Sequence, residues 1–254
     1  MPHDVTHWLS PHEVSTLCSG DYWNNVAVKQ QKAWWIVDGD GSACLEYLNS
    51  SGLLAQYRQA EEVIAALPTS QLKIADLAAG IGWTTALLSR LKNVSSVHAV
   101  EISQHRVGPL FEAAMDLFHA DRPKIHHYLG SFYNTQFADE ELDVVFMCQA
   151  FHHADEPARL LHEIDRILKP TGTVVVVGEH NVTKLKTVKR FLRALSKGQL
   201  KARFADLWPS DDVLGDHYYS HAMYRRMFSA VGLAANLVPS PMDTRLIVAQ
   251  HPRF

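Results

Sequence analysis

The stretch Asp76-Leu77-Ala78-Ala79-Gly80-Ile81-Gly82-Trp83 follows on from a short apolar run and opens a glycine-bearing loop. Small residues in such a loop let the backbone approach a ligand, and the start of a following helix offers free N–H groups. Glu101 ends the next apolar run, Val97–Val100, where its carboxylate is placed to accept both hydroxyls of an adenosine ribose. Together these positions predict a nucleotide site at the carboxyl ends of two strands.

Outward from this loop, apolar runs alternate with stretches of helical periodicity. The runs that predict buried strands are Lys73–Leu77, Val97–Val100, Leu142–Cys148 and Thr173–Gly178. Apolar residues recur at steps of three and four over 107–118 and again over 160–168, which is typical of one helix face. Runs without polar alternation suit parallel strands that are covered on both faces.

We therefore expect a doubly wound, Rossmann-like α/β fold with a seven-stranded sheet, parallel except for an antiparallel last strand. A final helix over Ala222–Val231 should precede the strand pair Ala234–Val238 and Arg245–Ala249.

Two segments lie outside this alternation. We expect residues 1–60 to form a helical N-terminal cap and 61–254 to form the α/β domain, in which 181–220 is a helical insertion after the fifth strand. Both segments should lie as a lid over the carboxyl ends of the strands, where open α/β sheets bind ligands. Four of the six tryptophans fall in the cap: Trp8, Trp23, Trp34 and Trp35.

The loop itself separates two kinds of nucleotide. A dinucleotide fingerprint G-x-G-x-x-G would need a third glycine where this chain has Thr85. Asp76 lies four residues before Gly80, where a carboxylate would repel a pyrophosphate but would suit an ammonium group. The loop therefore favours a nucleoside that carries an amino acid over a nicotinamide dinucleotide.

The chain resembles the class I S-adenosylmethionine-dependent methyltransferases, above all the group similar to the ubiquinone and menaquinone biosynthesis enzymes. Four motifs carry the resemblance in order, across roughly residues 55 to 180. They are the loop at 74–82, Val97-His98-Ala99-Val100-Glu101-Ile102-Ser103, the strand and histidine pair at 142–153, and Glu163-Ile164-Asp165-Arg166-Ile167-Leu168-Lys169-Pro170-Thr171-Gly172-Thr173.

The resemblance implies S-adenosylmethionine as cofactor, S-adenosylhomocysteine as product, and methyl transfer to an O, N or C atom of a small molecule in biosynthesis. It implies these cofactor-binding residues: Asp76, Ala78, Ala79, Gly80, Gly82, Glu101, Ile102, Ser131, Phe132 and Gln149. The chain departs from the family pattern at Ala78, which replaces a glycine, and at Ser131, which replaces an aspartate that accepts from the adenine amino group. Weaker adenine binding is the hypothesis that follows from Ser131.

A hydroxyl acceptor would call for a base, and we name His153, His217 and Tyr219 as candidates. We expect no metal site. The neighbours His152 and His153 should point in different directions, as should His126 and His127, and no spaced Cys/His set is present.

The bulk composition sets limits on partners. The net charge of −3 gives no global attraction to nucleic acid or to an anionic membrane. Three scattered cysteines predict no disulfide framework, and the sequence suggests neither a signal peptide nor a stable membrane insertion. We expect a cytoplasmic enzyme with a small-molecule acceptor and no nucleic acid, and we leave a homodimer open. The basic stretch 184–203 has an apolar face, which indicates a solvated helix or a surface for an acidic acceptor, a membrane or a protein.

Three alternatives stay open. The chain could be a catalytically silent, cofactor-binding subunit of a methyltransferase complex, or an NAD-dependent oxidoreductase. A nucleic-acid methyltransferase is the third, although the segment Gln149–His152 lacks the Asn/Asp-Pro-Pro-aromatic box of base-amino methylation.

Overall fold

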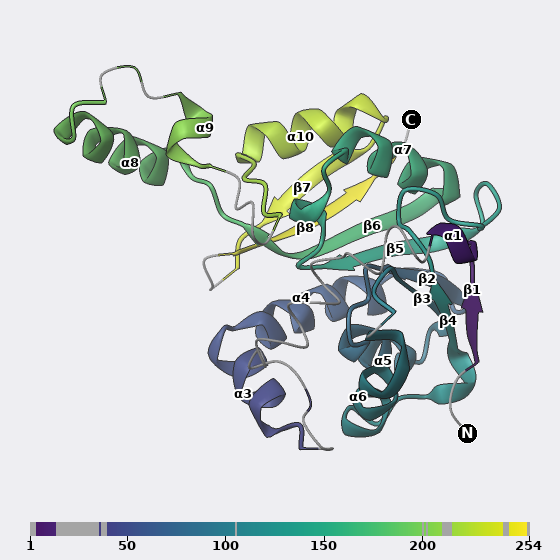
Figure 1. The fold of residues 1–254 in the computed structure, drawn as a ribbon. Helices are drawn as coiled ribbons and strands as arrows, with labels where there is room; N and C mark the ends of the chain where they lie inside the picture. The colour runs from purple at the N-terminus through teal and green to yellow at the C-terminus, as the bar shows by residue number, and fades with distance from the viewer. Residues whose placement is uncertain are drawn as a thin grey trace.

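The computed structural model describes residues 4–13, 36, 40–104, 106–199, 201, 203–209, 215–240 and 244–252. Within this part of the chain, an eight-stranded sheet runs through the middle of the molecule (Figure 1). In chain order its strands are β1 (Val5–His7), β2 (Leu72–Leu77), β3 (Val94–Glu101), β4 (Ile125–Leu129), β5 (Leu142–Cys148), β6 (Leu168–His180), β7 (Ala234–Val238) and β8 (Thr244–Gln250).

Across the sheet the strands follow the order β1-β4-β3-β2-β5-β6-β8-β7. All neighbours are parallel except at β8, which runs antiparallel to both β6 and β7. The doubly wound fold with an antiparallel last strand is therefore confirmed. The chain leaves the central strand β2 toward β3 on one side and later returns to β5 on the other. The sheet thus has its switch point between β2 and β5.

The strand count differs from the expected seven, because Val5–His7 pairs in parallel with His127–Leu129 at the edge of the sheet. This strand comes from residues 1–60, the segment that we expected to form a helical cap. Trp8, directly after β1, adds a second contact with β4. Its ring stacks on that of Tyr128, with 4.2 Å between the ring centroids. The ladder and this stacked ring together fix a three-residue strand that sequence periodicity does not reveal.

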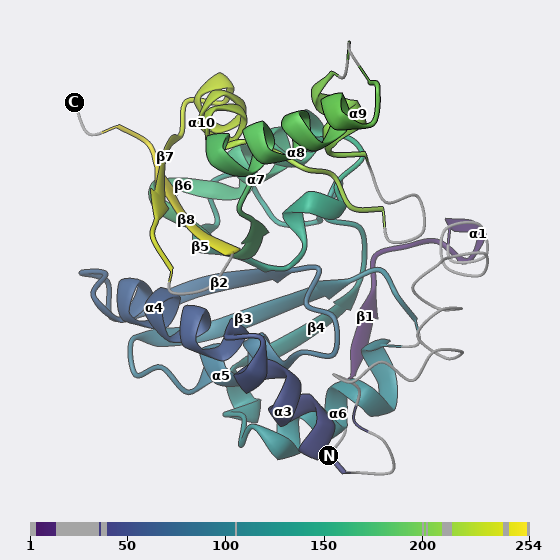
Figure 2. The ribbon, with the colours of Figure 1, turned by 90° about the vertical axis from the view of Figure 1, so that its left-hand side faces the viewer.

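Helices cover both faces of the sheet (Figures 1 and 2). One face carries α3 (Ser42–Ser50), α4 (Leu53–Ala65), α5 (Trp83–Ser89) and α6 (Phe111–Leu117), and the other carries α7 (Pro157–Ile167) and α10 (His221–Ala230). The remaining elements are α1 (Pro11–Glu13), α8 (Lys184–Ser196), α9 (Phe204–Leu207), a π-type turn η2 (Arg106–Leu110), and the 3₁₀ turns η3 (Arg122–Lys124) and η4 (Phe151–His153).

The predicted apolar face of α7 shows why the helices lie where they do. Leu160, Leu161, Ile164 and Ile167 are each at most 1% exposed and pack in one cluster with β5 and β6. Burial of each such side chain contributes about 1.5–3 kcal/mol. A separate cluster on the opposite face joins α3, α4, α5 and α6 to β2 and β3.

The two segments expected to form a lid are only partly described. Trp23, Trp34 and Trp35 lie outside the described residues. The expected boundary between residues 60 and 61 falls inside α4, whose Tyr57 and Ile64 are fully buried in the hydrophobic core. The lid role of either segment stays a prediction.

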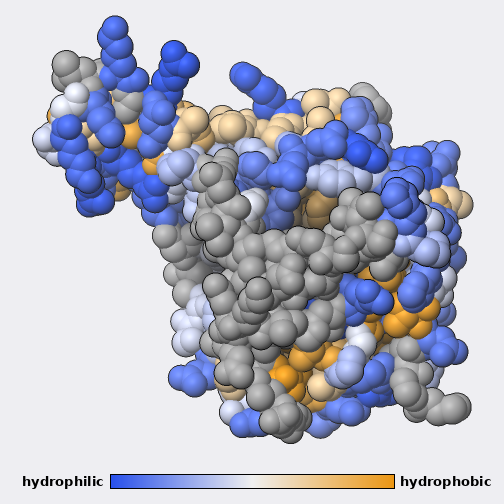
Figure 3. All heavy atoms as spheres, in the orientation of Figure 1, coloured by the Kyte–Doolittle hydropathy of each residue, from blue (hydrophilic) through white to orange (hydrophobic). Residues whose placement is uncertain are grey.

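Residues 184–196 of the basic stretch form α8, as its periodicity predicts, and α8 projects with α9 from the body of the molecule (Figure 1). Its surface is mostly hydrophilic (Figure 3), but Leu185, Val188 and Leu192 are more than half exposed. No helix in the described part of the chain is long and apolar enough to cross a bilayer.

Candidate functional site

The loop after β2 has the backbone of a tight ligand-binding turn. Ala78, Gly80 and Gly82 all have left-handed φ angles, of 57°, 60° and 83°. A side chain at Gly82 would overlap Phe111 and Met115 of α6, so only glycine fits there. The turn brings the chain to the start of α5 while α6 packs close behind it.

Asp76 lies behind this turn and is almost fully buried. Its Oδ2 accepts hydrogen bonds from the hydroxyls of Thr84 and Thr85, at 2.7 and 2.6 Å. Its Oδ1 is buried and has no hydrogen-bond partner among the described residues. Burial raises the pKa of Asp76 to about 6, and the two threonine hydroxyls limit that rise. A buried carboxylate with a spare oxygen suits a cationic group.

Glu101, at the end of β3, is joined to the same turn. Its Oε2 accepts the backbone N–H of Gly80 at 2.7 Å, and its Oε1 accepts the N–H of Ser103 at 2.8 Å. Each carboxylate oxygen keeps a further lone pair for a ligand. Glu101 therefore fixes the loop and also presents acceptors beside it.

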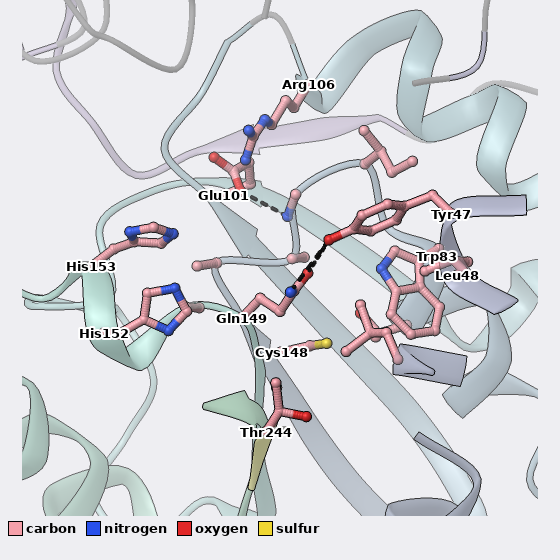
Figure 4. Close-up of a pocket in the computed structure, with 18 of the residues that line it drawn as sticks. Tyr47, Leu48, Trp83, Glu101, Arg106, Cys148, Gln149, His152, His153 and Thr244 are labelled. Atoms are coloured by element: carbon pink, nitrogen blue, oxygen red, sulfur yellow. Dashed lines mark hydrogen bonds between the residues drawn. The ribbon is translucent and has the colours of Figure 1, made fainter. Parts of the chain in front are cut away.

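A cavity of about 380 Å³ opens at the switch point, beside the carboxyl ends of β2, β3, β5 and β6 (Figure 4). Tyr47, Leu48 and Trp83 line one side of it, and His152 and His153 stand on the opposite side (Figure 4). Between them lies Gln149, whose amide is 3.5 Å from the Tyr47 hydroxyl and whose φ is 50°. The cavity thus has an aromatic end and an imidazole end.

Most of the predicted site residues meet here. The cavity is lined by Ala78, Ala79, Gly80, Glu101, Ile102, Phe132, Gln149 and His153. Asp76 and Gly82 are not among the lining residues, but the Thr84 hydroxyl, which donates to Asp76, belongs to a residue of the wall. Ser131 lines an adjoining cavity of about 450 Å³ that shares Ala78, Ile102, Phe132 and His153 with the first.

Two predicted base candidates lie elsewhere. His217 lines neither cavity, and its Nε2 is 3.0 Å from Asp155 Oδ1. Tyr219 packs against Phe151 and Tyr224, and burial raises its pKa to about 12. Of the three, the structure brings only His153 to the cavity wall.

The imidazole end contains residues that sequence reasoning did not select. His180 and Asp216 also line the cavity, and Glu179 lies buried behind His152. Burial alone would lower the pKa of His152, but the Glu179 carboxylate raises it above its usual value. Burial and the neighbouring His152 lower the pKa of His153 to about 4, which makes it a weak base at neutral pH. A signal was present, because Glu179-His180 directly follows the apolar run Thr173–Gly178 at a strand's carboxyl end.

Residues 75–176 match the family model described as a methyltransferase domain. An uncharacterised methyltransferase of Mycobacterium tuberculosis is 30% identical over 112 residues, 44% of this chain and 41% of that protein. The mitochondrial ubiquinone biosynthesis O-methyltransferase of Dictyostelium discoideum is 28% identical over 117 residues, 43% of this chain and 36% of that protein. The match thus spans about two fifths of the length of these curated relatives.

The fold is shared more widely than the sequence. Magnesium protoporphyrin IX methyltransferase of Synechocystis, solved with bound SAH, aligns with a TM-score of 0.60 at 12% identity, over 91% of this chain and 96% of that chain. A putative S-adenosylmethionine-dependent methyltransferase of Methanococcus maripaludis aligns with a TM-score of 0.55 at 16% identity, over 85% and 94%. At these identities the likeness establishes the fold.

Proposed function

Residues 75–176 match the family model of a methyltransferase domain, and from that match we propose that this chain is an S-adenosylmethionine-dependent methyltransferase acting on a small molecule. The observation that carries the proposal is the pair of acids around the loop. Asp76 keeps an unpartnered buried oxygen among the described residues, and Glu101 holds the Gly80 N–H.

The residues fit the cofactor group by group. Asp76 offers a carboxylate to the ammonium of the methionine part, and Glu101 offers acceptors to the ribose hydroxyls. Ile102 and Phe132 supply apolar surface to the adenine, and Ser131 offers a hydroxyl beside it. This assignment keeps the weaker adenine contact expected from Ser131.

When bound, S-adenosylmethionine supplies a methyl group on a positively charged sulfur, which is already electrophilic. The chain then has to align an acceptor and exclude water. The aromatic end, with Tyr47, Leu48 and Trp83, would hold an apolar part of the acceptor. The imidazole end would face its reacting O, N or C atom. The base role of His153 stays a prediction, as do a biosynthetic pathway and a cytoplasmic location.

The first experiment is calorimetric titration of the full chain with S-adenosylmethionine and S-adenosylhomocysteine. We expect binding that Glu101→Gln weakens tenfold or more, because a charged acceptor is worth about 1.5–3 kcal/mol. Asp76→Asn should weaken it similarly. The matched control is Glu62→Gln, since Glu62 is exposed on α4, away from the cavity.

Absence of binding by folded wild-type protein would overturn the proposal. Equal affinity for the cofactor in wild type and in all three variants would show that neither Asp76 nor Glu101 contributes to cofactor binding. Binding without methyl transfer to any acceptor would favour the silent-subunit alternative.

A further inference from the structure

Three segments bring donor atoms together at the imidazole end of the cavity. His152 and His153 lie on the 3₁₀ turn η4 after β5, and His180 ends β6. Asp216 comes from the chain before α10. All four residues line the cavity that contains the loop after β2.

We expected no metal site because adjacent histidines should point in different directions. In the structure, His152 and His153 do not point apart. Their ring centroids are 4.2 Å apart, and Figure 4 shows both rings at the cavity wall. A residue pair on a strand or α-helix would diverge, but the tight turn η4 gives both rings one direction.

The separations come near those of ligands that share one ion. Asp216 Oδ1 is 3.3 Å from His153 Nδ1 and 3.9 Å from His152 Nε2, and its Oδ2 is 3.3 Å from His180 Nε2. One donor atom each from His152, His153 and Asp216 lie within 4.8 Å of one another. First-row metals bind imidazole and carboxylate at about 2.0–2.2 Å, so donor atoms sharing an ion stand about 3–4 Å apart.

The surroundings of His152 are those of a metal-bound imidazole. Its Nδ1 is 3.2 Å from Glu179 Oε1, and the Tyr224 hydroxyl donates to Glu179 Oε2 at 2.7 Å. Glu179 is fully buried and His152 is 5% exposed. A carboxylate that accepts from one imidazole nitrogen fixes the tautomer and aims the other lone pair at a metal. Here that other nitrogen, Nε2, faces Asp216.

We propose that His152, His153 and Asp216 bind one divalent transition-metal ion at the acceptor end of the cavity. Two carboxylates, Asp216 and Glu179, balance its charge. The ion's open position would face the acceptor, where it would lower the pKa of a bound hydroxyl; the proton leaves to solvent and the ion keeps its charge. This role rests on the proposed function, but binding of the ion does not.

The test uses the whole 254-residue chain, freed of metal by dialysis against a chelator. Zn²⁺ is titrated in competition with a chromophoric chelator. We expect one equivalent to bind at micromolar concentration or tighter, and Asp216→Asn and His152→Gln each to weaken that binding at least tenfold. The matched control is His126→Gln, an exposed histidine of β4, which should leave it unchanged.

Co²⁺ provides a readout on the wild type alone, because visible absorption bands report imidazole ligands around it. Failure of folded wild type to bind either ion would overturn the proposal and leave a proton-linked network. Binding that the cluster variants do not weaken would place the ion elsewhere and overturn it too. S-adenosylmethionine titrated into the same proteins separates the proposals, since the cluster variants should keep cofactor binding.

Discussion

At residue 78 the chain holds an alanine in a left-handed backbone, with φ of 57°. The family pattern has glycine there, and the sequence shows only that a methyl group replaces a hydrogen. The structure shows that this alanine is strained. In the left-handed region of φ and ψ, its Cβ lies too close to the following carbonyl oxygen, which costs about 1–2 kcal/mol.

Ala78→Gly should therefore stabilise the protein by about 0.5–1 kcal/mol, since relief of strain exceeds the backbone entropy that glycine loses on folding. The measurement is the free energy of unfolding in urea. Ala79→Gly is the control: Ala79 has no left-handed φ and packs in the core, so it should destabilise. Equal signs for both variants would refute the strain argument.

Asp76 makes stability depend on pH in an unusual direction. Its pKa of about 6 in the folded chain lies above the ordinary value of 3.8, because burial disfavours the ionised form. The folded state therefore binds a proton that the unfolded state does not bind between about pH 6 and pH 4. This group destabilises the fold at neutral pH, and that cost is relieved as the pH falls through 6.

We expect Asp76→Asn to be more stable than wild type at pH 7.5, by on the order of 2 kcal/mol, and this difference should shrink at pH 5. Urea unfolding at both pH values measures it. Taking the difference between proteins cancels the titration of the histidines. A difference that stays constant with pH, as expected for the control Glu62→Gln, would contradict the assigned cause.

At the scale of elements, strands formed by continuous apolar runs could be predicted from the sequence, and strands that contain polar residues could not. Leu142–Cys148 appears as the strand β5 with the predicted bounds. Ile125–Leu129 carries His126 and His127 and gives no such run, so β4 escapes detection. Val5–His7 is a strand only because β4 offers it an edge. Short elements fixed by tertiary pairing leave no local signal.

One charged side chain joins α8 to the end of α9. The Arg190 guanidinium lies 3.7 Å from the centroid of the Trp208 ring and donates to the Leu207 carbonyl at 2.6 Å. Arg190→Ala should weaken the docking of α8 by about 1–2 kcal/mol and speed amide exchange in 184–196. Arg193→Ala, an exposed neighbour on the same helix, is the control. Identical exchange in both variants would show that the contact does not hold the projection.

At the scale of the molecule, the motifs predicted the β2, β3 and β5 side of the site better than its imidazole end. The loop after β2, Glu101 at the end of β3 and Gln149 after β5 each lie at the end of a strand that the sequence predicts. The imidazole end joins residues 152, 180 and 216, which only the completed sheet and the chain before α10 bring together. The direction in which His152 and His153 point depends on η4, a three-residue turn without a periodic signature.

Because the cavity lies at the switch point, a bound cofactor would contact both halves of the sheet and hold them together. The cavity lies at the switch point between β2 and β5, and its wall includes residues that follow each of these strands, such as Ile81 after β2 and Ala150 after β5. A ligand that binds only the folded chain stabilises it by about 2.7 kcal/mol at 100 times its dissociation constant. For a chain of this size, that corresponds to a rise in Tm of about 5–10 °C.

We therefore expect S-adenosylhomocysteine at that concentration to raise Tm by this amount in a single calorimetric transition. At the same ligand concentration the rise in Glu101→Gln should be smaller by about half, because tenfold weaker binding removes about 1.4 kcal/mol. NAD⁺ is the matched ligand control and should give no rise, since Asp76 would repel a pyrophosphate. A rise with NAD⁺ alone would restore the oxidoreductase alternative. Two separate transitions with S-adenosylhomocysteine would mean that the ligand binds one half of the sheet without joining the other.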